Sequence, residues 1–183
     1  MKVEVLSIDD NWLEIKQATL TTVDKTSNNY PSSEWKRKLL LSEHSPIRKL
    51  KIAWKWIDIP YWVSVHLVRH KIGIEHFVKT QRSDRTGINR DDLPQGSLIV
   101  HECEANAQAI IFISRKRLCN CASKETREVW KLFLESIKDI QPELYSVCVR
   151  ECIYRNGICP EFKSCGYNKT EPFKEELNKY VNE

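Results

Sequence analysis

Apolar and polar residues alternate with a period of two in several segments of the chain. Residues 1–10 alternate in this way, and residues 49–57 place four large apolar side chains on one face: Leu50, Ile52, Trp54 and Trp56. A period of two is typical of a strand with one buried face. The pattern therefore predicts a strand in both segments, and a further short strand over residues 98–103.

Helical spacing of apolar residues occupies much of the remaining chain, and predicts helices over residues 33–41, 106–118, 123–140 and 144–150. Three of these helices begin at side chains that cap exposed backbone N–H groups: Ser32 or Ser33, Asn106 and Ser123. Pro60 opens another helix, which ends at the cationic run 69–71 and Gly73. Because strands and helices are interspersed, the sequence predicts an α/β or α+β fold.

The composition indicates one folded domain over residues 1–183, without internal repeats. Hydrophobic residues make up 41% of the chain and charged residues 30%, which excludes a disordered protein. No apolar run approaches the roughly 20 residues that span a bilayer. The amino terminus has neither the basic leader nor the apolar core of a signal peptide. We therefore expect a cytoplasmic protein without a membrane partner.

Cationic residues are concentrated between positions 69 and 90, although the net charge of the chain is only +4. They are Arg69, His70, Lys71, Lys79, Arg82, Arg85 and Arg90. The first three can simply complement the dipole at a helix end, an effect worth about 0.3–1 kcal/mol each. The polar turn over 81–85 has no helix end to serve, and Arg beside Ser and Gln suits the oxygens of a phosphate. The stretch therefore predicts an anionic small-molecule ligand, whereas nucleic acid would need many more phosphate contacts.

The order of several motifs resembles that of the flavin-dependent thymidylate synthases. The family's hallmark is Arg-His-Arg, a spacer of seven residues, then Ser-x-Arg. This chain has Arg69-His70-Lys71 and Ser83-Asp84-Arg85, with eleven residues between them. Further matches follow in the family's order: His44-Ser45-Pro46, Pro60, Arg90 before Leu93-Pro94, Asn106-Ala107, Arg117-Leu118, and Ala122 with Glu125 and Arg127-Glu128. The resemblance covers about residues 44–130.

This resemblance implies a single domain with a central, mainly antiparallel sheet flanked by helices. It implies an enzyme that methylates dUMP at C5 to give dTMP. Methylenetetrahydrofolate would be the carbon donor, reduced FAD the hydride donor and NADPH the reductant. A homo-oligomer, specifically a tetramer, is also implied, because neighbouring subunits complete each site in the family.

The resemblance also assigns roles to individual residues. The dUMP-binding set is His66, Arg69, Gln81, Arg82, Ser83, Asp84, Arg85 and Arg90, and the FAD-binding set is His70, Lys71, Asn106 and Gln108. Arg117 is the expected catalytic residue, since a fixed cation stabilises negative charge that develops on the uracil ring. Asn106 and Arg117 also have structural alternatives, as a helix N-cap and as a cation at a helix C-terminus.

Departures from the family pattern leave alternative hypotheses open. Arg48-Lys49 stands where the family usually has Glu-His, Gln108 and Phe112 replace residues that contact the flavin, and His66 replaces a Gln that faces the nucleotide. One alternative is a related C5 modification of a pyrimidine nucleotide, and another is a non-catalytic nucleotide-binding homologue without flavin. A metal-stabilised nucleic-acid-binding module agrees least with the ordered motifs.

Seven cysteines in a chain expected to be cytoplasmic indicate reduced thiols or metal ligands. Four of them lie in the cysteine-rich segment 148–165: Cys148, Cys152, Cys159 and Cys165. Four thiolates can bind zinc or an iron–sulfur cluster. The alternative is that Cys148 and Cys152 are small buried hydrophobes on one helix.

Overall fold

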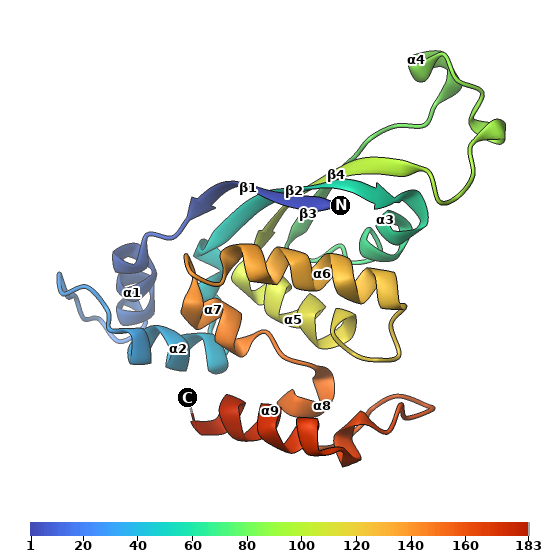
Figure 1. Cartoon of the computed structure of the whole chain (residues 1–183). Coiled ribbons are helices and arrows are strands. Elements are labelled where there is room, and N and C mark those ends of the chain that lie inside the picture. Colours follow the sequence, from blue (N-terminus) through green and yellow to red (C-terminus); the bar gives the residue numbers. More distant parts are fainter. Residues whose placement is uncertain (183) are drawn as a thin grey trace.

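The computed structural model describes residues 1–182 and has a four-stranded antiparallel sheet at its centre (Figure 1). The strands are β1 (Lys2–Asp9), β2 (Lys51–Pro60), β3 (Ile74–Val78) and β4 (Leu98–Asn106). Their order is β1-β2-β4-β3, so β2 and β4 occupy the middle of the sheet. The predicted α+β class and antiparallel sheet are thereby confirmed.

The helices of the described residues lie mainly on one side of this sheet (Figure 1). They are α1 (Trp12–Thr21), α2 (Ser33–Leu41), α3 (Tyr61–Leu67), α4 (Ser83–Thr86), α5 (Ala107–Arg117), α6 (Lys124–Ile137), α7 (Pro142–Val147), α8 (Glu151–Tyr154) and α9 (Glu171–Asn182), with short 3-10 helices η1 (Ser45–Lys49), η2 (Arg90–Asp92) and η3 (Tyr167–Lys169). Ser32, Asn106 and Ser123 cap α2, α5 and α6 as predicted, because each side-chain oxygen accepts a hydrogen bond from an N–H of the first turn.

The core lies between the sheet and the helices α5 and α6, which cover one of its faces (Figure 1). The apolar face of β2 is buried as predicted, and Trp54 stacks on Phe133 of α6 with ring centroids 3.9 Å apart. Trp56 Nε1 donates a hydrogen bond to the carbonyl of Val129 at 3.0 Å, which satisfies the polar atom of a buried indole. The alternation of β2 thus fixes which face of the sheet receives α6.

The structure differs from the sequence-based expectations in five places. The helix that follows Pro60 ends at Leu67, well before Gly73, because the chain turns there to enter β3, a strand that the sequence analysis missed. The helix expected over 144–150 spans Pro142–Val147, and Ile140 is exposed beyond the end of α6. The expected charged tail contains α9, whose Phe173 packs in a small second core with Val149 and Ile153.

Residues 79–97 form a long connection between β3 and β4 that projects away from the rest of the chain (Figure 1). We call this connection the arm. Its base is attached to α3, since the N–H groups of Tyr61 and Trp62 donate to the carbonyls of Ser97 and Gln95 at 2.9 and 3.3 Å. Its tip carries α4 and η2. The basic residues at positions 81–90 therefore lie on a projection rather than beside the core.

Candidate functional site

The guanidinium of Arg117 joins the end of α5 to the end of α3. Its Nε donates a hydrogen bond to Nε2 of His70 at 2.8 Å, and its Nη2 donates to the carbonyl of His66 at 2.6 Å. Arg69 lies near enough for its charge to lower the pKa of both Arg117 and His70, after the larger effect of burial. Four residues of the predicted site, His66, Arg69, His70 and Arg117, are thus brought together.

The ring of His70 is held in its neutral form. Because Nε2 accepts a hydrogen bond from Arg117, the ring proton is on Nδ1. Burial, and then the charge of Arg117, lowers the pKa of His70 to about 4. An unfolded histidine takes up its proton near pH 6.5, so acidification from that value to about 4 favours the unfolded chain. His70 therefore presents a neutral ring at the site at neutral pH.

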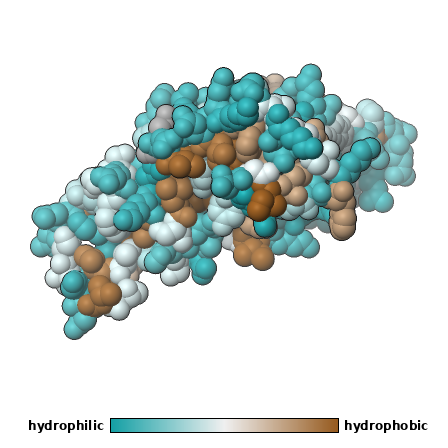
Figure 2. Space-filling model, turned by 90° about the horizontal axis from the view of Figure 1, so that it is seen from below, coloured by the Kyte–Doolittle hydropathy of each residue, from teal (hydrophilic) through white to brown (hydrophobic). Residues whose placement is uncertain are grey.

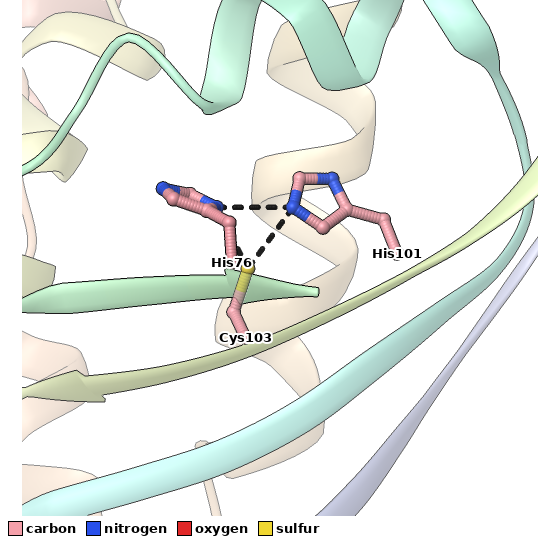
Figure 3. Close-up of side chains that lie close together, drawn as sticks. All are labelled: His76, His101 and Cys103. Atoms are coloured by element: carbon pink, nitrogen blue, oxygen red, sulfur yellow. Dashed lines mark hydrogen bonds between the residues drawn. The ribbon is translucent and has the colours of Figure 1, made fainter. Parts of the chain in front are cut away.

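The side chains of His76, His101 and Cys103 form a triad in which His76 is half-buried and the other two are buried (Figure 3). His76 Nε2 donates to the carbonyl of His70 at 2.8 Å, which leaves its Nδ1 as an acceptor 3.0 Å from His101 Nε2. Cys103 Sγ lies 3.2 Å from His76 Nδ1 and 3.3 Å from His101 Nε2. Burial lowers the pKa of His101 to about 3 and raises that of the Cys103 thiol. The triad is a neutral hydrogen-bonded support for the His70 backbone.

A ring nitrogen of His76, a ring nitrogen of His101 and the sulfur of Cys103 are atoms of the types that bind metals. Their protons are nevertheless accounted for by hydrogen bonds among themselves and to His70. His101 Nδ1 is the one nitrogen of the triad that is buried without a partner. We therefore assign the triad to the positioning of His70.

A shallow pocket of about 250 Å³ opens at this corner. Its lining residues, all among the described positions, are His70, Lys116, Arg117, Cys119, Cys121, Ala122 and Glu161. We call it the Arg117 pocket. Two cationic side chains and a neutral imidazole line it, so it suits an uncharged ring that develops negative charge.

Gln108 lies on α5, and the other residues predicted to bind FAD lie beside this helix or at its N-cap. Gln108 Oε1 accepts a hydrogen bond from Arg48 Nε at 2.5 Å. One turn further along, Phe112 is half exposed, and the ring of His70 lies edge-on to it with centroids 6.4 Å apart. Lys71 is exposed next to His70. We call this group of residues the α5 surface, and it combines cations with an exposed aromatic ring.

Asn106 performs the structural role that the sequence left open. Its side-chain oxygen accepts a hydrogen bond from the N–H of Ala109 at 2.9 Å and so caps α5. Gly73 packs against it with a φ of 73°, and a Cβ at Gly73 would lie 2.6 Å from Asn106 Nδ2. Only glycine fits at this approach of two chain segments. The cap fixes the start of α5 and therefore the position of the α5 surface.

The residues predicted to bind phosphate lie on the arm. Ser83 Oγ accepts a hydrogen bond from the N–H of Arg90 at 3.1 Å, and the guanidinium of Arg82 binds both carboxylate oxygens of Asp84, at 3.0 and 2.7 Å. The side chains of Arg85 and Arg90 are about two-thirds exposed. Gln81 is half buried at the start of the same segment. Ser83 and Arg90 are thus brought together, but none of the described residues that line the Arg117 pocket belongs to the arm.

The four cysteines at positions 148, 152, 159 and 165 do not converge on one point in the described structure. Cys148 is fully buried and hydrogen-bonded with Ser114, which agrees with the hydrophobic alternative. The thiols that do meet are those of Cys119, Cys121 and Cys165. The first two were given no role in the sequence analysis, because two cysteines on one turn reveal no partner until the fold brings a third beside them.

Other residues of this region were also missed in the sequence. His76, His101 and Cys103 gave no local signal, since their roles depend on contacts between strands and helices far apart in the chain. Arg48 was noted only as a departure from the family pattern, and its contact with Gln108 becomes evident in the structure. Phe112 was noted only as a departure from the family pattern. Its exposure beside His70 becomes evident only in the structure.

A larger hollow of about 590 Å³ lies between α6, α7 and α9. Arg150, on its wall, pairs with Glu176, and the phenol of Tyr145 donates to Glu135 at 2.5 Å. Glu176 and Glu135 thus already bind the guanidinium and the phenol that a bound anion would need as hydrogen-bond donors. The hollow is therefore a poorer phosphate site than the arm. Within residues 1–182, no helix has both the length and the apolar character needed to cross a bilayer.

Comparisons with known proteins give the fold but no sequence family. The chain matches no sequence model of a protein family and no curated protein. Two crystal structures of the flavin-dependent thymidylate synthase ThyX from Helicobacter pylori, both with FAD and dUMP, superpose with TM-scores of 0.67 and 0.68 at 12% and 13% identity. They cover 82% and 81% of this chain, and 100% and 99% of their own chains.

A third solved structure, the UMP/dUMP methylase PolB from Streptomyces cacaoi with 5-Br dUMP, superposes with a TM-score of 0.61 at 15% identity. The match covers 80% of this chain and 93% of the methylase. The chain therefore has the fold of the flavin-dependent thymidylate synthases. At these identities the comparison establishes the fold alone.

The neutral state of His70 gives a prediction for its titration. The imidazole signals of His70 in NMR spectra should titrate near pH 4, and Arg117→Ala should raise that pKa, because the nearest positive charge is removed. The pKa should stay below 6.5, since burial is the larger cause. An unchanged His70 titration in Arg117→Ala would contradict the contact between the two side chains.

Proposed function

We propose that the chain is a flavin-dependent enzyme that methylates a uracil nucleotide at C5, converting dUMP to dTMP. The observation that carries this proposal is the half-buried guanidinium of Arg117, fixed by His70 and the His66 carbonyl at the wall of the pocket. The fold supports it, because the solved structures that share the fold include a thymidylate synthase with FAD and dUMP and a methylase with 5-Br dUMP.

Arg117 is the proposed catalytic residue. Negative charge develops on the uracil ring when C5 attacks a carbon donor, and a preorganised cation stabilises that charge more strongly than it stabilises the ground state. The two hydrogen bonds to α3 hold the guanidinium in place before substrate binds. No reorganisation of the arginine is then needed during the reaction.

The α5 surface fits a flavin dinucleotide. Arg48 and Lys71 supply positive charge for a pyrophosphate, and the exposed ring of Phe112 offers a plane for a flavin or adenine ring. Gln108 and His70 complete the polar contacts, while Asn106 fixes the start of the helix. Bound FAD would supply the hydride of the reaction. Methylenetetrahydrofolate and NADPH are the proposed carbon donor and reductant.

The arm of a second copy is the proposed source of the phosphate contacts. Ser83, Arg85 and Arg90 form an exposed basic tip, whereas the Arg117 pocket of the same chain contains none of them within the described residues. A projection that carries exposed cationic side chains is suited to reach a neighbouring subunit. We therefore propose a homo-oligomer, with a tetramer as in the family that the sequence resembles.

Flavin and nucleotide should bind to the same site. The purified protein, loaded with FAD if necessary, should show the absorbance of oxidised flavin, and addition of dUMP should shift that spectrum because the two ligands are adjacent. UMP and dCMP serve as nucleotide controls. A colourless protein that added FAD cannot reconstitute would contradict the proposal and favour the non-catalytic nucleotide-binding alternative.

Arg117→Ala should reduce turnover of dUMP by about two to three orders of magnitude, the usual effect of removing one group that stabilises a developing anion. Its flavin content should stay unchanged, because the α5 surface does not include Arg117. Lys124→Ala is a matched control, since Lys124 is an exposed cation that pairs with Glu128. Turnover of Arg117→Ala equal to that of the control would remove Arg117 from the mechanism.

A further inference from the structure

Three cysteine side chains from distant parts of the chain meet beside the Arg117 pocket. Cys119 and Cys121 lie in the loop between α5 and α6, and Cys165 lies in the connection between α8 and α9. The Sγ atoms of the three residues lie within 4.8 Å of one another. All seven cysteines are free thiols in this structure. The cluster is therefore a set of three potential ligands brought together by tertiary structure.

Among the described residues, no fourth cysteine, histidine or carboxylate joins the cluster, so water would complete a tetrahedral site. Cys152 lies on α8 outside the cluster. Lys116, near the end of α5, pairs with Glu151 at 3.7 Å and with Glu161 at 3.8 Å, which holds this part of the chain against the cysteine loop. Cys159 lies in the same segment but is not part of the cluster.

The loop that carries Cys119 and Cys121 has the form of a ligand turn. The N–H of Ala122 donates to the carbonyl of Cys119 at 3.0 Å, and the N–H of Cys121 points at Cys119 Sγ at 3.5 Å. Backbone N–H groups aimed at sulfur stabilise a thiolate, as outer contacts do around metal ligands. Arg127 donates to the carbonyls of Asn120 and Ala122 and so fixes the turn from the side of α6.

Hydrophobic packing holds the connection that carries Cys165 at Tyr167, which contacts the second core, but not at the exposed residues 162–165. Between α8 and α9 the described backbone contains a single short helix, η3, and the large apolar side chains of Ile158 and Phe162 are mostly or fully exposed. The face that includes α8 and α9 is largely polar, with hydrophobic residues scattered between (Figure 2). A long irregular segment of this kind needs another source of order, and a bound metal is a common one.

Zinc suits the cluster better than a disulfide or an iron–sulfur centre. A disulfide would use two of the three thiols and leave the third, whereas a tetrahedral metal uses all of them. Zn–S bonds of about 2.3 Å place the sulfur atoms of a tetrahedral site about 3.8 Å apart, within the spacing found here. In a [4Fe–4S] cluster each cysteine binds a different iron atom, and a [2Fe–2S] cluster divides its four cysteines between two iron atoms, so three cysteine sulfurs around one point suit a single metal ion better.

We propose that Cys119, Cys121 and Cys165, with water as the fourth ligand, bind one Zn²⁺ ion. The metal displaces the thiol protons to solvent, and Lys116 and Arg127 offset the negative charge of the three thiolates. The site ties the connection between α8 and α9 to the loop that follows Arg117. Since Cys119, Cys121 and Glu161 line the Arg117 pocket, the metal also fixes one wall of that pocket.

Metal analysis and cobalt substitution test this proposal on the full chain, without a metal-binding tag. The protein as purified should contain about one zinc per chain. After the zinc is removed under reducing conditions, added Co²⁺ should give the sulfur-to-cobalt charge-transfer and visible bands of a tetrahedral thiolate site. Cys121→Ser and Cys165→Ser should each weaken zinc binding by at least about tenfold, because loss of even an outer contact costs that much.

Cys159→Ser is the matched control and should retain the metal, because Cys159 lies in the same segment outside the cluster. Cobalt titration of the unmodified chain keeps the test decisive even if a serine variant does not fold. A reduced chain that binds neither zinc nor cobalt overturns the proposal. So does a mass two hydrogens lower under non-reducing conditions, which indicates a disulfide. Metal loss in Cys159→Ser alone would overturn the assignment of the ligands.

Discussion

The contact of Arg117 with the end of α3 determines the geometry of the candidate site. One guanidinium spans from α5 to the ring of His70 and the carbonyl of His66, so the ends of two helices are fixed relative to each other. His76, backed by His101 and Cys103, holds His70 from the opposite side through its carbonyl. The pocket, the α5 surface and the cysteine loop all adjoin this contact.

Local patterns in the sequence were sufficient to predict the strands and helices that bury one apolar face. The alternation in β2 and the caps Ser32, Asn106 and Ser123 predicted the sheet and three helices, because these signals depend only on near neighbours. β3 was missed, since its alternating residues lie within a strongly basic stretch whose charges suggested a binding loop. The residue motifs identified Arg117 and His70 as site residues, but their contact with each other depends on the fold.

The cysteines and the arm show why spacing along the sequence alone is a poor guide to which residues share a binding site. Residues near in sequence can lie apart, as Cys148 and Cys165 do, while Cys121 and Cys165 meet across a long separation. The arm separates Arg85 and Arg90 from the pocket that their charges would serve in the proposed reaction. Both observations favour a site assembled from distant parts, with one wall from the C-terminal segment and, as proposed, the phosphate contacts from a second copy.

A mixture of two variants tests this shared site most directly. Arg90→Ala removes charge from the arm and Arg117→Ala removes it from the pocket, so each variant alone should lose most dUMP turnover. When the two are unfolded and refolded together, about a quarter of the sites should combine an intact arm with an intact pocket from different chains. Recovery of about that fraction of the activity is the expected result. No recovery in hybrid oligomers would show that arm and pocket act within one chain, and would contradict the account.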